Sequence, residues 1–164
     1  MAEEPKPTAS HRAEYYALRG VVGFLHALPW SVACAFGSKL GTIGYRPLGI
    51  RRRVVERQIA AAFPELSERE VETLSVRAYA HLGRSSIETA LLPSIGQQGV
   101  LDMVESVEGF ELVEKAMAER KGAILVTGHL GNWELAGAYV AARGVPMDVI
   151  VRTQANPLFD DYIN

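Results

Sequence analysis

The chain has 164 residues, enough for one ordinary domain, and its 48% hydrophobic and 22% charged residues are typical of a globular protein rather than a disordered one. A net charge of −2 provides no general electrostatic reason to bind nucleic acid, so no nucleic-acid partner is expected. The single cysteine, Cys34, excludes a disulfide framework within the chain, and no Cys/His pattern has zinc-ligand spacing, so no metal site is expected.

The N-terminal part combines a polar tail with a long uncharged stretch. The first residues carry mixed charges and two prolines without apolar periodicity, so we place a disordered tail at 1–14. No Asp, Glu, Lys or Arg occurs from Gly20 to Ser38, a stretch that approaches the length of a membrane span and is interrupted near its centre by Pro29. Three interpretations fit this composition: a transmembrane helix, a re-entrant or interfacial helical pair, and a buried hairpin of helices.

A basic cluster follows the uncharged stretch. Only Glu56 opposes its five arginines, Arg46, Arg51, Arg52, Arg53 and Arg57. Such a cluster is either a solvated helix face or, next to an apolar segment, a surface for anionic lipid. It belongs to a predicted helix over 51–63, which Pro64 ends.

A second helix is predicted to begin at Ser67. Ser67 and Glu70 have the spacing of a capping box, in which each side chain bonds to the backbone N–H of the other residue. His81 on this helix is expected to have a packing or surface role rather than a catalytic one. Glu88, among apolar neighbours, is either buried against an arginine or exposed, and the pattern does not choose between these.

The second half of the chain alternates between helical and extended patterns. A helix is predicted over 109–120, and the apolar run 123–128 is too short for a helix and predicts a buried strand. Residues 132–143 again have helical spacing, and 147–152 predict a second strand. A strand, a helix and a second strand form a right-handed βαβ unit with parallel strands.

One histidine lies on the predicted strand-to-helix turn. His129 follows Gly128, and Glu134 falls in the first turn of the helix that Asn132 caps. A carboxylate beside an imidazole fixes its tautomer and stabilises its charged form, which suits a general base. The alternative is a loop histidine near a solvated glutamate.

Two further residues near this turn are candidates for binding substrate. The backbone amide of Gly131 can approach a ligand closely, and a helix N-terminus favours developing negative charge. Arg152 ends the second predicted strand, at the edge of the sheet where ligands bind in such folds. Arg152 is therefore either a surface ion-pair residue or a phosphate- or carboxylate-binding residue.

The segment His129-Leu-Gly-Asn-Trp-Glu134 resembles the H-x-x-x-x-(D/E) motif of the bacterial lipid A biosynthesis acyltransferases, the lauroyl/myristoyl transferase group of the lysophospholipid acyltransferase superfamily. The resemblance runs from about Tyr15 to the end of the chain. Besides the motif it includes, in order, Leu28-Pro29, Leu40-Gly41, Ala62-Phe63-Pro64-Glu65, His81-Leu82-Gly83 with Glu88, Gly122 through Glu134, and Arg152 with Asn156-Pro157-Leu158.

The resemblance implies a fold and an activity. The fold is α/β: a helical membrane-associated segment over 15–48, followed over 49–164 by the first part of a glycerolipid-acyltransferase-like αβ sandwich. The activity is transfer of an acyl chain from an acyl carrier protein or coenzyme A thioester to a hydroxyl of a membrane glycolipid, at the cytoplasmic face of the bacterial inner membrane. The thioester is a co-substrate, and no cofactor is expected.

The resemblance also implies residue roles. His129 and Glu134 are the catalytic pair, and Gly131, Asn132, Arg152 and Asn156 contact substrate. The family's pattern continues past Asn156-Pro157-Leu158, so we expect this chain to be the N-terminal part of such an enzyme. Two alternatives remain: a non-catalytic membrane-associated fragment that needs a missing C-terminal half, and a hydrolase that uses His129 and Glu134 on water.

Overall fold

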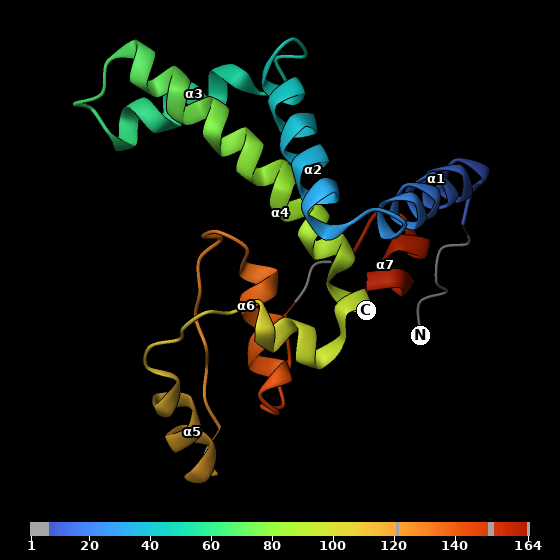
Figure 1. Ribbon diagram of the computed structural model, residues 1–164, viewed down its shortest axis with the longest axis vertical. Coiled ribbons are helices and arrows are strands. Elements are labelled where there is room, and N and C mark those ends of the chain that lie inside the picture. Colours follow the sequence, from blue (N-terminus) through green and yellow to red (C-terminus); the bar gives the residue numbers. More distant parts are fainter. Residues whose placement is uncertain (1–6, 121, 151–152, 164) are drawn as a thin grey trace.

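The computed structural model describes residues 7–120, 122–150 and 153–163, and within these ranges the chain folds into helices without a strand (Figure 1). The long helix α4 is central. Helices α2 and α3 pack along one part of α4, and α6 packs along another part (Figure 1). Helix α1 extends away from this group, and α7 packs against α1.

Helices α1 (Ala9–His26) and α2 (Trp30–Tyr45) contain the uncharged stretch. The Thr8 side chain caps α1 by accepting a hydrogen bond from the His11 backbone N–H at 3.2 Å. Pro29 occupies the N-cap position of α2, so the proline divides the stretch into two helices, as its missing N–H and fixed φ require. Helix α1 begins at Ala9, inside the range 1–14 that the sequence analysis assigns to a tail.

Helices α3 (Arg52–Ala62) and α4 (Glu68–Asp102) follow. The predicted capping box is confirmed, because the Ser67 N–H donates to Glu70 Oε2 at 2.8 Å and the Ser67 side chain accepts from the Glu70 N–H. Near its C-terminal end α4 is kinked at Gly96, whose φ of 65° lies in the left-handed region that glycine adopts without steric cost.

Helices α2 and α4 approach each other closely at three glycines, Gly37, Gly41 and Gly83. A Cβ atom on Gly37 would lie 2.6 Å from the Gly83 carbonyl oxygen, and one on Gly83 would overlap the Gly37 carbonyl in turn. A Cβ on Gly41 would overlap the Tyr79 carbonyl. The two backbones therefore touch where no side chain separates them, as small residues allow at close helix crossings.

The apolar core lies where the end of α1, the start of α2 and the middle of α4 meet. Leu25, Ala33 and Leu91 are its buried members, and three partly buried side chains pack against them: Leu28, Trp30 and Ile87. This core joins α1, α2 and α4, whereas α3 and α6 pack against α4 outside it.

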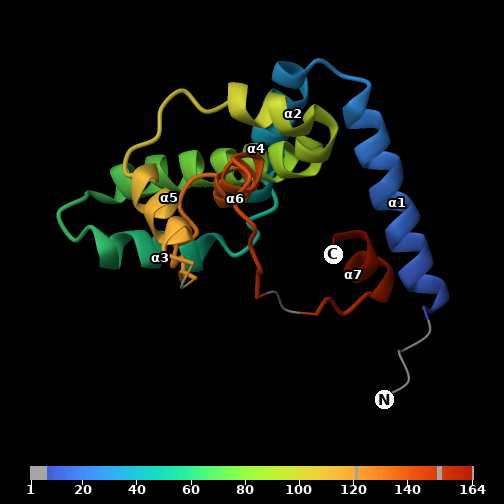
Figure 2. The same cartoon turned by 90° about the horizontal axis from the view of Figure 1, so that it is seen from below.

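Helices α5 (Phe110–Ala118), α6 (Trp133–Ala142) and α7 (Pro157–Ile163) complete the chain. Helix α6 packs against α4, and α7 lies beside α1 although the two are at opposite ends of the sequence (Figure 2). The predicted helices over 109–120 and 132–143 thus exist with ends within two residues of α5 and α6.

The predicted α/β fold is wrong. Residues 123–128 and 145–150 have no regular secondary structure, and within the described ranges no sheet forms, so neither the βαβ unit nor the αβ sandwich is present. The side chain of Ile124 is 91% exposed and that of Ile150 is 102% exposed. An apolar run forms a strand only when a neighbour accepts its N–H groups and supplies carbonyls, and neither run finds such a neighbour among the described residues.

The sequence left open how the uncharged stretch is arranged. Among the described residues, no helix combines the length and the apolar character needed to cross a membrane. Val22 and Leu25 on α1 and Ala33 and Cys34 on α2 are buried in the fold, while other apolar residues on both helices stay exposed.

Candidate functional site

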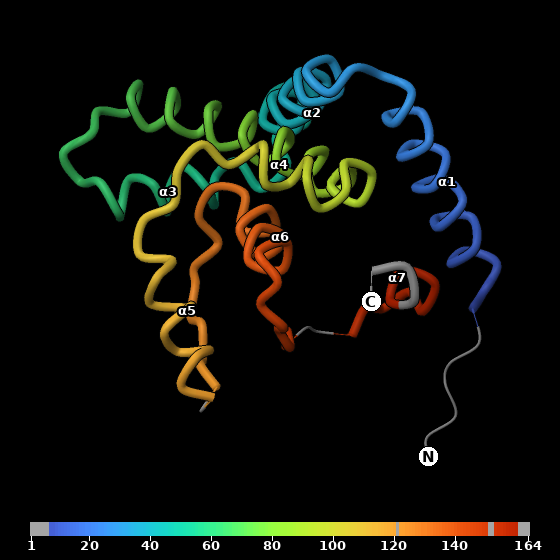
Figure 3. Tube along the Cα trace, turned by 60° about the horizontal axis from the view of Figure 1, so that its bottom comes forward, coloured from blue at the N-terminus to red at the C-terminus, as the bar shows by residue number. Residues whose placement is uncertain are grey.

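The candidate site is built on the segment that leads into α6. After α5 the chain runs back through 122–131 as an open loop and enters α6 at Asn132 (Figure 3). Gly131 has a φ of 59°, and a Cβ added there would meet nothing within 4 Å. A glycine at this point permits the left-handed turn, and the space where a side chain would lie is open.

Asn132 is the N-cap of α6, as the sequence predicts. Its Oδ1 accepts a hydrogen bond from the Leu135 N–H at 3.1 Å, which satisfies one of the backbone donors that begin a helix. Its Nδ2 donates to Glu88 Oε2 on α4 at 3.0 Å. Both polar atoms of the Asn132 side chain are therefore engaged within the fold.

His129, Trp133 and Glu134 form one group, in which His129 and Glu134 are exposed and Trp133 is half-buried. The His129 and Trp133 rings meet edge to face with centroids 4.5 Å apart, and the Trp133 indole N–H donates to Glu134 Oε1 at 3.0 Å. Trp133 thus contacts both members of the predicted catalytic pair. No direct hydrogen bond joins His129 to Glu134 in the described part of the chain. The Trp133 indole links them instead, because it contacts both side chains.

Behind this group lies a buried carboxylate. Glu88 is 8% exposed, and its Oε1 accepts from Arg84 Nε at 2.6 Å while its Oε2 accepts from Asn132. The hydrogen bond to Glu88 raises the pKa of Arg84, so the guanidinium stays charged. The sequence left open whether Glu88 is exposed or buried against an arginine. In the structure Glu88 is buried against Arg84.

The Cys34 thiol on α2 lies close enough to this pair to respond to its charges. Burial raises the pKa of Cys34, the negative charge of Glu88 raises it further, and Arg84 opposes this effect. The thiol is consequently neutral at ordinary pH and acts as a small buried apolar group.

Two further residues were predicted to bind substrate, Arg152 and Asn156. Arg152 falls outside the described residues. Asn156 is 5% exposed, and its Nδ2 donates to the His11 carbonyl at 3.0 Å and to Glu14 Oε2 at 3.1 Å, which ties the start of α7 to α1. Its Oδ1 accepts from the Leu158 N–H at 3.1 Å. Asn156 therefore has a structural role in holding α7.

In the described part of the chain, no three residues of His, Cys, Asp or Glu lie together as a ligand group. His81 is exposed on α4, and its Nδ1 lies 3.2 Å from Ser85 Oγ.

Sequence reasoning missed two features of this site. Trp133 lies inside the recognised motif, but the contacts of its indole with His129 and Glu134 were not predicted. The link from Arg84 through Glu88 to Asn132 was also missed. The i, i+4 spacing of Arg84 and Glu88 on one helix was a usable signal for the ion pair, whereas nothing in the sequence indicated Asn132 as the third member.

Comparison with known proteins identifies relatives over most of the chain. A family model described as bacterial lipid A biosynthesis acyltransferase matches residues 3–164. The chain is 28% identical over 141 residues to the lipid A biosynthesis lauroyltransferase of Escherichia coli K12, and 26% identical to the palmitoleoyltransferase of that strain and to a lipid A biosynthesis acyltransferase of Shigella flexneri.

Each alignment covers 86% of this chain and 45% of the relative, so the chain spans about half the length of the curated proteins that it matches. No solved structure matches significantly.

Proposed function

Because the chain belongs to the bacterial lipid A biosynthesis acyltransferase family, we propose that it transfers a fatty acyl chain from an acyl thioester to a hydroxyl group of a lipid A precursor or a related membrane glycolipid. The proposed donor is an acyl carrier protein or coenzyme A thioester. The observation that supports this proposal best is the family match over residues 3–164, together with a His129–Trp133–Glu134 group within the matched range whose His129 and Glu134 are exposed.

In the proposed reaction His129 is the general base. Its imidazole removes the proton from the acceptor hydroxyl, whose oxygen attacks the thioester carbonyl. The tetrahedral intermediate collapses by breaking the C–S bond, and the imidazolium returns the proton to the leaving thiolate. An ester and a free thiol result, and no covalent acyl-enzyme forms.

Glu134 stabilises the charged imidazole in this proposal. Trp133 supports the arrangement, since its ring packs against His129 at 4.5 Å and its N–H holds the Glu134 carboxylate at 3.0 Å. The Gly131 amide is the candidate donor to the oxyanion, because Gly131 has no side chain to block a ligand and the Cβ position is open.

The remaining substrate contacts are proposed as well. Arg152 would bind phosphate or the thioester donor through its planar guanidinium. Asn132 would act mainly by holding the start of α6 near the substrate, because its side-chain atoms already have partners in the fold. The side chain of Asn156 is likewise engaged, so its contribution would come through the position of α7.

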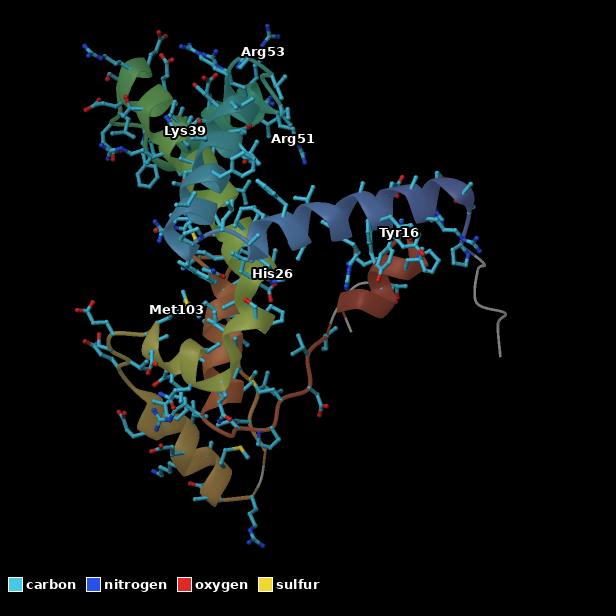
Figure 4. The ribbon with its side chains drawn as sticks, turned by 45° about the vertical axis from the view of Figure 1, so that its right-hand side comes forward. Tyr16, His26, Lys39, Arg51, Arg53 and Met103 are labelled. Atoms are coloured by element: carbon cyan, nitrogen blue, oxygen red, sulfur yellow. The ribbon has the colours of Figure 1, made fainter. Side chains whose placement is uncertain are left out.

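We propose that the protein works at the cytoplasmic face of the bacterial inner membrane, attached through α2. Its exposed apolar residues recur at i, i+4, i+8 and i+11 and therefore share one face, which we call the α2 face: Val32, Phe36, Leu40 and Ile43. The exposed cations Lys39, Arg51 and Arg53 lie along α2 and at the start of α3 (Figure 4). An apolar face beside cations suits a membrane surface rich in anionic lipid.

A second candidate is a membrane-associated chain that does not catalyse by itself. It is favoured by the apolar side chains that stay exposed in the loop before the site, with Ile124 and Val126 both 91% exposed. Such side chains near a site indicate a surface that another part of the assembly covers.

The test is the variant His129→Ala in the protein as its gene encodes it, assayed with acyl carrier protein thioester and lipid A precursor. Loss of a general base predicts a fall in kcat of roughly a hundredfold or more. The melting temperature should be unchanged, because His129 is exposed. His81→Ala is the matched control and should keep full activity.

The outcomes separate the candidates. Turnover by His129→Ala at the wild-type rate would refute the assignment of the base. An inactive wild-type protein that gains activity with an added partner chain would favour the second candidate. Release of free fatty acid without acylated acceptor would identify a hydrolase.

A further inference from the structure

A polar chain connects α4 to the start of α6 behind the candidate site. It runs from Arg84 to Glu88 at 2.6 Å, from Glu88 to Asn132 at 3.0 Å, and from Asn132 to the Leu135 N–H at 3.1 Å. Each oxygen of the Glu88 carboxylate has its own donor. The residues are far apart in sequence, since 44 positions separate Glu88 from Asn132.

The chemistry of Glu88 determines how the Asn132 amide is oriented. An ionised carboxylate only accepts hydrogen bonds, so the amide must present its NH₂ group to Glu88. The amide oxygen then points the other way, toward the Leu135 N–H, where it caps α6. The two accepting oxygens of Glu88 therefore select the one amide orientation that can cap the helix.

The burial of the Glu88 carboxylate makes the rotated orientation of the Asn132 amide energetically unfavourable. Glu88 is 8% exposed, and a buried carboxylate without donors is costly. Rotating the Asn132 amide would place its oxygen against the carboxylate and leave the Leu135 N–H without its acceptor. Both penalties act against rotation, so the first turn of α6 is held in one position relative to α4.

That first turn carries the groups of the candidate site. Trp133 and Glu134 are its first two residues, and the His129 ring rests on Trp133. A shift of the turn would move the Glu134 carboxylate and the surface that supports the imidazole together.

We propose that Glu88 is a positioning residue for acyl transfer, which acts through Asn132 to hold the first turn of α6 and thereby the relative placement of His129 and Glu134. This inference rests on the proposed function. It assigns to Glu88 an effect on the chemical step, transmitted without contact between Glu88 and substrate.

The experiment reverses the polarity of the Glu88–Asn132 hydrogen bond in the protein as its gene encodes it. Glu88→Gln places an amide NH₂ where an acceptor is needed, and Asn132→Asp places two carboxylates against each other while keeping a cap for α6. In the double variant the new amide NH₂ at position 88 donates to the new carboxylate at position 132, while the amide oxygen at position 88 still accepts from Arg84. The bond is thus restored with its donor and acceptor exchanged.

We expect each single variant to lower kcat by roughly tenfold to a hundredfold with KM changed less than about threefold, because a displaced catalytic group affects the chemical step. The double variant should recover kcat to within about threefold of wild type. Hydrogen exchange at the Leu135 amide should accelerate in the singles and return to the wild-type rate in the double. Glu72→Gln, which alters an exposed ion pair between α4 and Arg46 at the end of α2, is the matched control and should change none of these quantities.

Single variants with wild-type kcat would overturn the proposal, as would a double variant no more active than the product of the single effects predicts. Loss of activity that follows thermal unfolding, with no change in kcat at temperatures where all variants are folded, would also overturn it. His129→Ala is assayed in parallel. If that variant stays active the proposed base is wrong, while Leu135 exchange still reports whether Glu88 holds the helix start.

Discussion

At the residue scale, the buried Tyr45 hydroxyl has a charged partner. Tyr45 is 1% exposed, and its hydroxyl donates to Glu56 Oε1 at 2.6 Å, an oxygen that also accepts from Arg52 Nε at 2.7 Å. The hydrogen bond from Tyr45, followed by that from Arg52, lowers the pKa of Glu56. The Tyr45 hydroxyl therefore stabilises the fold through an ionised partner, and this contribution to the free energy of unfolding depends on pH.

The sign of the dependence follows from the lowered pKa. A carboxyl group whose pKa is lower in the folded than in the unfolded state stabilises the fold above the unfolded pKa, and this stabilisation is lost as the pH falls through the folded value. Tyr45→Phe should therefore reduce the free energy of unfolding by about 1.5 kcal/mol near neutral pH. The difference in unfolding free energy between wild type and Tyr45→Phe should shrink as the pH falls below the usual pKa range of a glutamate. Urea unfolding at several pH values measures it.

Tyr79→Phe is the control for this prediction. The Tyr79 hydroxyl donates to the Ile50 carbonyl, which does not titrate, so the cost of removing that hydroxyl should be the same at each pH. Parallel pH profiles for the two variants would contradict the role given to Glu56.

At the scale of elements, the contact between α2 and α4 depends on the absence of side chains. Gly37 and Gly41 lie one helical turn apart on α2 and face Gly83 on α4. Backbone atoms cannot move aside as a flexible side chain does, so an added methyl group must push the two helices apart.

Gly83→Ala should lower the free energy of unfolding by about 3 kcal/mol, because its Cβ would overlap the Gly37 carbonyl. The melting temperature, measured by circular dichroism, should fall by roughly 6–12 °C. Gly23→Ala is the control, since Gly23 is a helical glycine of α1 with nothing within 4 Å of an added Cβ. It should raise stability by about 0.5–1 kcal/mol through helix propensity alone. A Gly83→Ala protein as stable as wild type would contradict the close packing.

At the scale of the whole molecule, charge and apolar surface are unevenly distributed. The net charge of the chain is −2, yet between Lys39 and Arg57 six cations are opposed by the single anion Glu56. The α2 face borders this basic region, and Leu48 and Ile50 extend its exposed apolar surface. The proposed membrane attachment therefore has an electrostatic part and an apolar part, which respond differently to salt.

The two parts can be separated with vesicles of phosphatidylethanolamine and phosphatidylglycerol. Replacing Arg51 and Arg53 together by Gln should weaken binding by about 2 kcal/mol, roughly thirtyfold, with the loss largest at low salt. Phe36→Ser should weaken binding by an amount that salt does not change.

Cosedimentation measures both effects. Arg77→Gln with Arg120→Gln makes the same charge change at exposed positions outside this region and should bind within about threefold of wild type. Equal losses for the two arginine pairs would show that total charge, and not this surface, governs attachment.

The features that the sequence determined by itself are local ones. The Ser67–Glu70 capping box, the Asn132 cap of α6 and the break at Pro29 each depend on atoms within about one helical turn, so the residues concerned find each other in any chain that contains them. The ordered motifs were likewise enough to identify the family, which the match over residues 3–164 confirms.

Only the tertiary structure decided which distant groups meet. Asn156 binds α1 across 145 positions, and Glu88 meets Asn132 across 44, because helix docking brings them together and no local pattern encodes the pairing. The predicted strands failed for the same reason. An apolar run between glycines has the composition of a strand, but a strand exists only where another segment completes its hydrogen bonds, and that requirement belongs to the fold as a whole.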